Sequence, residues 1–227
     1  MLFDWYLEIG CRSGKVFASV RGKTVAVDPF FRITQDVIGQ KPALYIMQKT
    51  SDDFFESNFL KRCGIELSVT FIDGMHLFEY LLRDFMNAER HSKRDGVIVM
   101  HDCCPFSFEM CTRDLNNIPK GAWTGDVWKL IPILKAARPD LQIDVLNCKP
   151  TGLVVVSNLD PASEVLFQKY EDTVDKWRDV ALEDFGLNAF YKLFEFQDGA
   201  TFQTETSVFD AVSLDPASHE VPGYATP

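Results

Sequence analysis

The chain has 227 residues, of which 46% are hydrophobic and 25% charged. That size and composition predict one α/β domain with a short appendage. The net charge of −10 argues against nucleic-acid binding, which needs clustered lysine and arginine. No apolar run is long enough to span a bilayer, and no secretory signal is recognised, so no membrane partner is expected. Six scattered cysteines without CxxC spacing indicate reduced thiols and a cytoplasmic protein.

A glycine turn follows the first predicted strand. Residues 5–9 form this strand, and Gly10 and Gly14 come after it, four positions apart. Without side chains, the backbone can turn sharply here and approach a ligand closely. A helix predicted over residues 15–20 would direct its free N–H groups toward that ligand. Turns of this kind also occur without a ligand, so the turn needs support from a second feature.

That second feature is Asp28. It ends a second predicted strand, residues 24–28, about 20 residues beyond the glycines, which is the spacing of a carboxylate that accepts both ribose hydroxyls of a nucleotide. The alternative interpretation makes Asp28 a turn residue before Pro29. Glu8, at the end of the first strand, has a similar alternative as an acid that only stabilises the nearby helix.

Further strands and helices alternate along the chain, which indicates a doubly wound, Rossmann-like sheet of seven strands covered on both faces. The sheet is expected to be mostly parallel, with an antiparallel last strand from a terminal hairpin. The remaining predicted strands are residues 43–47, 67–72, 96–100, 141–146 and 153–156, and the main helices start at Ser51 as N-cap, after Gly74, and at Val127.

Polar residues fall at the carboxyl ends of five strands, where the ligand of such a sheet binds. These residues are Glu8, Asp28, Ser51, Asp73 and Asp102. We expect three regions: a cofactor-binding domain (1–158), a C-terminal helical appendage (159–196) and a polar, partly disordered tail (197–227).

Residues 5–158 resemble class I S-adenosylmethionine-dependent methyltransferases. The segment EIGCRSG, residues 8–14, is similar to their first motif, E/DxGxxxG. FIDGMH at residues 71–76 and the strand-final His101-Asp102 resemble a branch of small-molecule O-methyltransferases that carries FIDGxH and HD. The resemblance implies that Gly10 lies under the methionine part of the cofactor and that Glu8 and Ser13 hold its ammonium. It also implies that Asp28 binds the ribose and that Ser51 and Asp52 border the adenine.

Asp73 and Asp102 invite comparison with catechol O-methyltransferase, which holds magnesium between carboxylates at these strand ends. A divalent cation such as Mg²⁺ favours oxygen ligands and would acidify an acceptor hydroxyl. Cys103 departs from that family, which has an asparagine ligand there, and a thiol is a poor magnesium ligand. Direct proton removal by His76 or His101 is therefore the preferred mechanism. A purely local hydrogen bond of His76 is the alternative.

The first motif begins close to Met1, whereas the similar family usually has helices before it that cover the cofactor. The cover is expected from residues 103–126, from the C-terminal segment or from a partner subunit. The segment 123–128, with two tryptophans, is the candidate lid, although aromatic packing at a helix start would explain it equally well. Abundant phenylalanine predicts a homodimer, with residues 190–196 as a candidate contact.

These features predict a methyltransferase that acts on oxygen of a small acceptor such as a sugar. The alternative is a nucleotide- or cofactor-binding module without turnover, retained for assembly. A hydride-transfer dehydrogenase is less favoured, because the GxGxxG phosphate loop is absent: Gly10 and Gly14 are too far apart.

Overall fold

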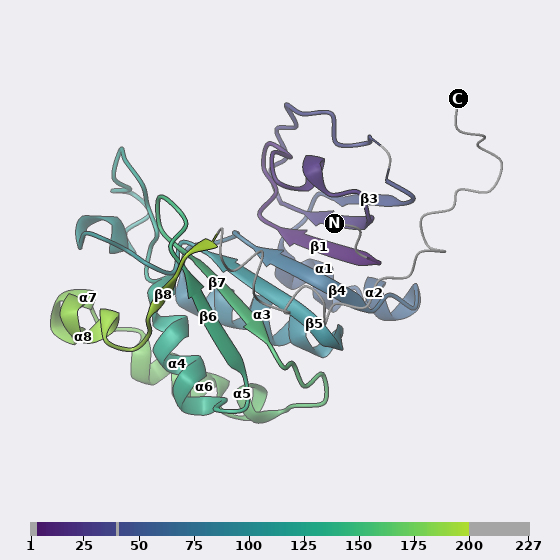
Figure 1. The fold of residues 1–227 in the computed structure, drawn as a ribbon. Helices are drawn as coiled ribbons and strands as arrows, with labels where there is room; N and C mark the ends of the chain where they lie inside the picture. Colours follow the sequence, from purple (N-terminus) through teal and green to yellow (C-terminus); the bar gives the residue numbers. More distant parts are fainter. Residues whose placement is uncertain (1–3, 40, 200–227) are drawn as a thin grey trace.

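The computed structural model describes residues 4–39 and 41–199, which form one mixed sheet with helices packed on it (Figure 1). The strand order is β3-β2-β1-β4-β5-β7-β6-β8. Strand β7 runs antiparallel to β5 and β6, and the other neighbours are parallel. The strands are β1 (Trp5–Ile9), β2 (Lys23–Val27), β3 (Leu44–Met47), β4 (Leu67–Ile72), β5 (Ser92–His101), β6 (Gln142–Leu146), β7 (Leu153–Ser157) and β8 (Phe196–Gln197).

This arrangement confirms the predicted fold class, including the antiparallel strand of the terminal hairpin. The structure adds an eighth strand, β8, which has only two residues and pairs with the outer edge of β6. The Asn147 N–H donates to the Gln197 carbonyl at 2.8 Å just beyond this pairing. So short a strand has no periodicity of its own, and the pairing depends on the chain returning to the sheet edge.

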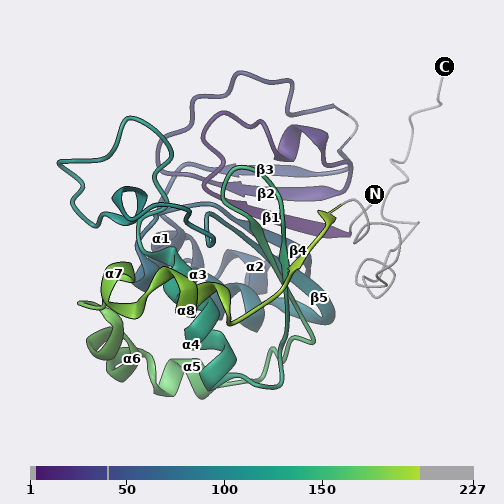
Figure 2. The same ribbon diagram turned by 60° about the vertical axis from the view of Figure 1, so that its left-hand side comes forward.

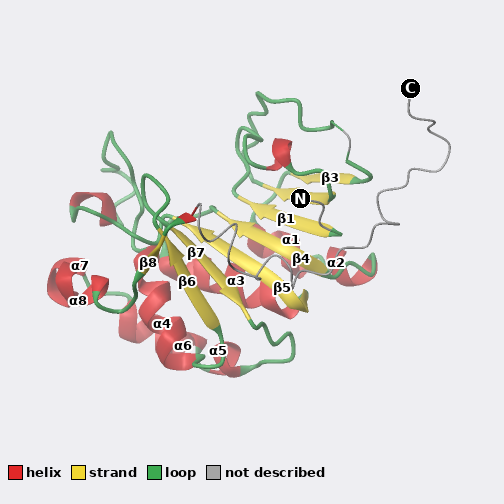
Figure 3. Ribbon diagram, in the orientation of Figure 1, coloured by secondary structure: helices red, strands yellow, loops and turns green. Residues whose placement is uncertain are grey.

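The eight α-helices of the described residues all contribute side chains to one core cluster, which also includes residues of β1, β2 and β5. Figures 2 and 3 show how these helices are arranged against the sheet. Their apolar side chains therefore lie on one face of the sheet. The helices are α1 (Ser51–Glu56), α2 (Phe59–Arg62), α3 (Phe78–Arg90), α4 (Leu130–Ala137), α5 (Val165–Gln168), α6 (Tyr170–Trp177), α7 (Leu182–Phe185) and α8 (Leu187–Tyr191).

The other face differs from the prediction. Its core cluster is smaller, and within the described residues a 3-10 turn, η1 (Phe17–Ser19), and the irregular loop that holds Val37 pack there. The helix predicted over residues 15–20 is therefore wrong, as is the expectation that helices cover both faces of the described sheet. A segment of six residues is too short to form a stable helix without a large apolar face to bury.

The region after β3 also differs locally from its prediction. Thr50, rather than Ser51, is the N-cap of α1, because its side chain accepts a hydrogen bond from the Asp53 N–H. The helix expected to start at Ser51 is interrupted at Asn58, which adopts the left-handed conformation (φ 53°) and separates α1 from α2. Asparagine tolerates this conformation better than most residues.

The segment expected to form an appendage packs on the main core. Phe190 in α8 is fully buried, with its ring centroid 5.6 Å from that of Trp128. Phe190 is therefore not available to a partner subunit, although Phe196 remains 44% exposed. The division into regions and the homodimer stay predictions, and most of the predicted tail (200–227) lies outside the described residues.

In the described part of the chain, no helix combines the length and the apolar character needed to cross a bilayer.

Candidate active site

The predicted polar residues meet at one edge of the sheet. Because β1, β2, β3, β4 and β5 are mutually parallel, their carboxyl ends lie side by side. Glu8 lies within β1, Asp28 directly follows β2, and Asp73 directly follows β4. His101 ends β5 and Asp102 comes next, whereas His76 stands just before α3.

Glu8 is a buried acid, with 1% of its surface exposed. The Tyr6 hydroxyl donates to Glu8 Oε2 at 2.6 Å. Burial raises the pKa of Glu8 to about 7, although the hydrogen bond from Tyr6 acts in the opposite direction. Glu8 is therefore a carboxyl group in an apolar setting, and a cationic ligand beside it would favour its ionised form.

The glycine turn is held tightly against β4. Gly10 has φ +88°, and a Cβ at this position would collide with the backbone carbonyl of Asp73. Gly14 has φ +80°, and a Cβ there would lie 2.6 Å from Val37. Both positions therefore require glycine for conformation and for close packing.

Asp28 fixes this turn from the neighbouring strand. Its Oδ2 accepts the Arg12 N–H at 2.8 Å, and its Oδ1 accepts the Phe30 N–H at 2.6 Å. Each carboxylate oxygen can accept a second hydrogen bond, so a ligand hydroxyl remains compatible with these contacts. Ser13, in the same turn, is partly buried, and its carbonyl accepts the Thr34 N–H at 3.0 Å.

The start of α1 is occupied by internal contacts. Arg83 donates to both oxygens of Asp52, at 2.8 and 2.7 Å. Ser51 forms a side-chain hydrogen bond with Asp84, a fully buried acid in α3 whose pKa is raised to about 7 by burial. These two predicted cofactor residues are thus at the expected strand end, where they also anchor α1 to α3.

Four side chains from the two specific motifs form one cluster. His76 Nε2 lies 3.5 Å from Asp73 Oδ1 and 3.4 Å from Asp102 Oδ2. His101 Nδ1 lies 3.3 Å from Asp73 Oδ1 and 3.2 Å from Asp102 Oδ1. Two carboxylates and two imidazoles are thus in mutual contact, although they are separated by up to 29 positions in the sequence.

The hydrogen bond of His76 Nδ1, the ring nitrogen that points away from the carboxylates, determines where this ring carries a proton. His76 Nδ1 lies 2.7 Å from the Trp123 carbonyl oxygen, and a carbonyl can only accept a hydrogen bond, so Nδ1 carries a proton. In the neutral ring, Nε2 then has a lone pair that faces two carboxylates. This arrangement is unfavourable unless a positive charge lies among the three groups, either a proton on Nε2 or a cation.

The pKa shifts in the cluster follow from the same contacts. Burial lowers the pKa of His76, but Asp73 and Asp102 outweigh it, and the net shift is upward. The two carboxylates raise the pKa of His101 to about 10, against the effect of burial. Burial raises the pKa of Asp73, yet the two histidines more than compensate, and its net shift is downward.

Asp102 is held in an uncommon conformation. Its φ of +61° is in the left-handed region, and the Thr151 hydroxyl donates a short hydrogen bond to its Oδ1. Residues kept in sparsely populated conformations concentrate at functional sites. The neighbouring Cys103 is fully buried, and its Sγ contacts the His101 carbonyl at 3.4 Å.

The cluster has the composition of a cation site. Among the described residues, Asp73, His76 and Asp102 each offer a ligand atom, and these atoms lie within 4.8 Å of one another. The buried His101 Nδ1 has no well-directed hydrogen bond, so its contacts with the carboxylates are electrostatic. Cys103 does not belong to this ligand group.

Several contributors were not identified in the sequence. Tyr6 could have been, because residues two apart on a strand share a face and Glu8 is two positions away. Thr151 and the Trp123 carbonyl gave no signal, since one belongs to a hairpin loop and the other is a backbone group. Trp123 was expected in a lid, and its ring does pack on His76, with centroids 4.9 Å apart.

Comparison with known proteins agrees with the fold. Residues 7–103 match a family model described as a methyltransferase domain. No curated protein matches the sequence significantly. Among solved structures, cofactor-bound Rv0187 from MTB is similar, with a TM-score of 0.50 and 13% identity over 68% of this chain and 72% of that one.

Two further solved structures have TM-scores below 0.5. The O-methyltransferase TomG from Streptomyces achromogenes, in complex with SAM, gives 0.48 with 15% identity, over 68% of this chain and 72% of its own. The MycE methyltransferase of the mycinamycin pathway, with Mg, SAH and mycinamycin VI, gives 0.47 with 15% identity. That match covers 71% of this chain but only 46% of MycE.

The family model covers the glycine turn, the strand end with Asp28 and the Asp73–Asp102 cluster, and the fold agrees with it. Residues 7–103 are therefore similar to a methyltransferase domain in both sequence and fold.

Proposed function

We propose that this chain transfers a methyl group from S-adenosylmethionine to a hydroxyl oxygen of a small acceptor, such as a sugar. The proposal rests mainly on one observation: His76 Nε2 lies 3.4–3.5 Å from carboxylate oxygens of both Asp73 and Asp102. A titratable nitrogen held among carboxylates can accept the proton that a hydroxyl loses as it attacks a methyl carbon.

The cofactor is assigned to the glycine turn. S-adenosylmethionine supplies, when bound, an electrophilic methyl group next to a positively charged sulfur. Glu8 and Ser13 would bind its ammonium, Gly10 and Gly14 would let the backbone approach it, and Asp28 would accept the ribose hydroxyls. The buried carboxyl of Glu8 fits this role, because within the described residues it forms no ion pair or hydrogen bond with a lysine, arginine or histidine side chain. Ser51 and Asp52 would border the adenine.

His76 acts as general base in this proposal. Its Nδ1–H remains bonded to the Trp123 carbonyl, so the ring is fixed with Nε2 beside Asp73 and Asp102, where the acceptor hydroxyl would bind. Asp73 and Asp102 then stabilise the imidazolium that forms, as their effect on the pKa of His76 indicates. His101 neutralises part of the carboxylate charge. The chain thereby aligns acceptor oxygen and methyl carbon for in-line displacement.

A divalent cation such as Mg²⁺ remains compatible with the same residues. Asp73 and Asp102 would hold it through oxygen atoms, and it would supply positive charge that acidifies an acceptor hydroxyl. Since Nε2 of His76 cannot both bind a cation and accept the proton, the two mechanisms differ in their response to metal removal.

The direct test is a screen of hydroxylated acceptors for release of S-adenosylhomocysteine, combined with calorimetry of S-adenosylmethionine binding. Binding together with acceptor-dependent release supports the proposal. Binding without release from any acceptor would favour the non-catalytic cofactor-binding module. Absence of binding would refute both functions.

Asp28→Ala is expected to weaken S-adenosylmethionine binding by about 1.5–3 kcal/mol, because a charge-assisted contact with the ribose is lost. Part of the loss will come from the turn, since Asp28 also accepts the Arg12 and Phe30 N–H groups. Asp28→Asn, which keeps one acceptor oxygen, should lose less. Calorimetry on folded variants measures both values, and unchanged affinity in Asp28→Ala would remove Asp28 from the cofactor site.

S-adenosylmethionine binding is expected to tighten as pH rises through about 7. The pKa of Glu8 is raised to about 7 in the free protein, and only its ionised form attracts the ligand ammonium. Below this pKa, binding must first release a proton, so affinity should fall by up to about tenfold per pH unit. Glu8→Gln should bind more weakly and show only the titration of the ligand amine, which provides the control. Parallel pH profiles of the two proteins would contradict this role of Glu8.

A further inference from the structure

The loop between β5 and α4 surrounds His76 on the side away from the carboxylates. Besides accepting the His76 Nδ1–H, Trp123 packs its ring on the imidazole, and its indole N–H donates to the Thr112 carbonyl at 2.9 Å. Trp123 is thereby tied back to its own loop. The position of its carbonyl depends on how this loop is anchored.

Asp126 anchors the end of the loop to the turn that carries His76. Its backbone N–H donates to the His76 carbonyl at 3.2 Å, and its Oδ1 accepts the Phe78 N–H at 2.9 Å. Phe78 is the first residue of α3, whose N-cap Leu77 has no capping side chain. Asp126 thus caps α3 from a distant part of the chain. Gly125 (φ +52°) leaves no room for a Cβ, which would collide with the His76 carbonyl.

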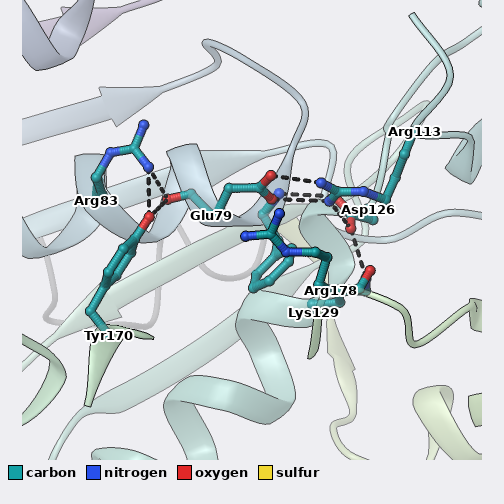
Figure 4. Close-up of polar contacts among 8 residues, drawn as sticks. Glu79, Arg83, Arg113, Asp126, Lys129, Tyr170 and Arg178 are labelled. Carbon is teal, nitrogen blue, oxygen red and sulfur yellow. Dashed lines mark hydrogen bonds and ion pairs between the residues drawn. The ribbon is translucent and has the colours of Figure 1, made fainter. Parts of the chain in front are cut away.

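Arg113 connects these contacts to α3 (Figure 4). Its guanidinium donates to both oxygens of Glu79, at 2.6 and 3.0 Å, and to Asp126 Oδ2 at 2.5 Å. The second cation on Asp126 is Lys129, only 1% exposed, which donates to Oδ2 at 2.7 Å and to the Arg178 carbonyl at 3.2 Å. The buried acid Asp126 is therefore held by two cations and one helix N-terminus.

We propose that Arg113 is a positioning residue for His76. By fixing Asp126 and Glu79 together, Arg113 holds residues 123–126 so that the Trp123 carbonyl faces His76 Nδ1. This contact keeps the proton on Nδ1 and leaves Nε2 to face Asp73 and Asp102. The catalytic significance of this orientation rests on the proposed function, but the orientation itself does not.

The Nδ1 proton of His76 provides the readout. A hydrogen bond to a carbonyl slows exchange of this proton with water, whether or not Nε2 is also protonated. The chain has only four histidines (His76, His91, His101 and His219), so ¹⁵N labelling of histidine gives a spectrum simple enough to assign, with His76→Asn identifying the signal. No methyl donor or acceptor is needed.

Arg113→Gln is expected to speed exchange of the His76 Nδ1 proton by at least tenfold, or to remove its signal. Arg113→Lys, which keeps the charge but loses the bidentate geometry, should restore part of the protection. Lys120→Gln is the matched control, because Lys120 is an exposed cation of the same loop, and it should leave the signal unchanged. Arg113 is itself partly exposed, so its variants are expected to fold.

The outcomes separate a positioning role from a merely structural one. A lower unfolding midpoint in Arg113→Gln with an unchanged Nδ1 signal would overturn the inference, because it would show that Arg113 stabilises the fold without holding His76. Equal loss of the signal in Lys120→Gln would also overturn it, since loop charge alone would then be responsible. If no acceptor gives release of S-adenosylhomocysteine but Arg113→Gln loses the His76 Nδ1 signal, the proposed function is refuted and the positioning role of Arg113 is supported.

Discussion

His76→Ala is expected to lower methyl transfer by roughly 10²–10⁴-fold, the usual loss when a general base is removed. Nε2 of His76 faces both Asp73 and Asp102. His101 also faces these carboxylates, but through a buried Nδ1, so we expect it to replace His76 poorly. Affinity for S-adenosylmethionine should change little, because the residues assigned to its ammonium and ribose lie in β1, in the glycine turn and directly after β2. Initial rates of S-adenosylhomocysteine formation and calorimetric binding measure the two effects separately.

His91→Ala is the matched control for this variant. His91 follows α3, stacks its ring on Phe55 with centroids 5.8 Å apart, and bonds through Nδ1 to the Asn87 carbonyl. It has no contact with the cluster, so its replacement should leave turnover unchanged. Full activity of His76→Ala would exclude His76 as the base. Activity that a chelator abolishes and magnesium restores would instead support a cation held by Asp73 and Asp102.

Glu89→Ala is expected to lower the free energy of unfolding by about 3–5 kcal/mol, the range for breaking a buried ion pair from one side. Glu89 and Arg138 have side chains only 4% and 2% exposed, and they form two hydrogen bonds of 2.7 and 2.9 Å. Glu89 Oε1 also accepts the Asp160 N–H at 3.0 Å. The variant thus leaves a buried guanidinium underpaired and frees the start of the C-terminal segment. Urea unfolding measures the loss.

Asp140→Asn tests the second ion pair of Arg138, which its guanidinium forms with Asp140. Asp140 contacts Arg138 at 2.6 Å, but its side chain is 49% exposed, so water can replace the contact. We expect a loss below about 1 kcal/mol, as for exposed ion pairs. A loss from Glu89→Ala as small as that from Asp140→Asn would mean that Asp140 alone satisfies Arg138, and that the buried pair contributes little to stability.

The sequence by itself determined the alternation of strands and helices and the edge at which the site lies. Short runs rich in β-branched and aromatic residues, such as residues 67–72 and 96–100, favour strands, and the polar residues at strand ends are found where each run stops. The same reasoning gave Asp28, Asp73, His101 and Asp102 as neighbours along one edge. Parallel strands place their carboxyl ends together regardless of the details of packing.

Local signals were less reliable where segments are short. The six residues after Gly14, predicted as a helix, form only the 3-10 turn η1, and Asn58 divides a segment that periodicity makes continuous. Propensity over a few residues is weak compared with the tertiary contacts that a segment makes or lacks. The two-residue strand β8 exists only because the chain returns to the edge of β6.

The protonation of the cluster was decided by tertiary structure alone. The sequence brings two aspartates and two histidines to one edge, but which nitrogen of His76 carries the proton depends on the Trp123 carbonyl, 47 positions away. In our proposal, the contact between Arg113 and Asp126 holds that carbonyl in place. In the sequence, these two residues look like ordinary charged residues of a loop. Backbone groups and long-range ion pairs leave no pattern in a sequence, because their partners are chosen by the folded chain and not by spacing along it.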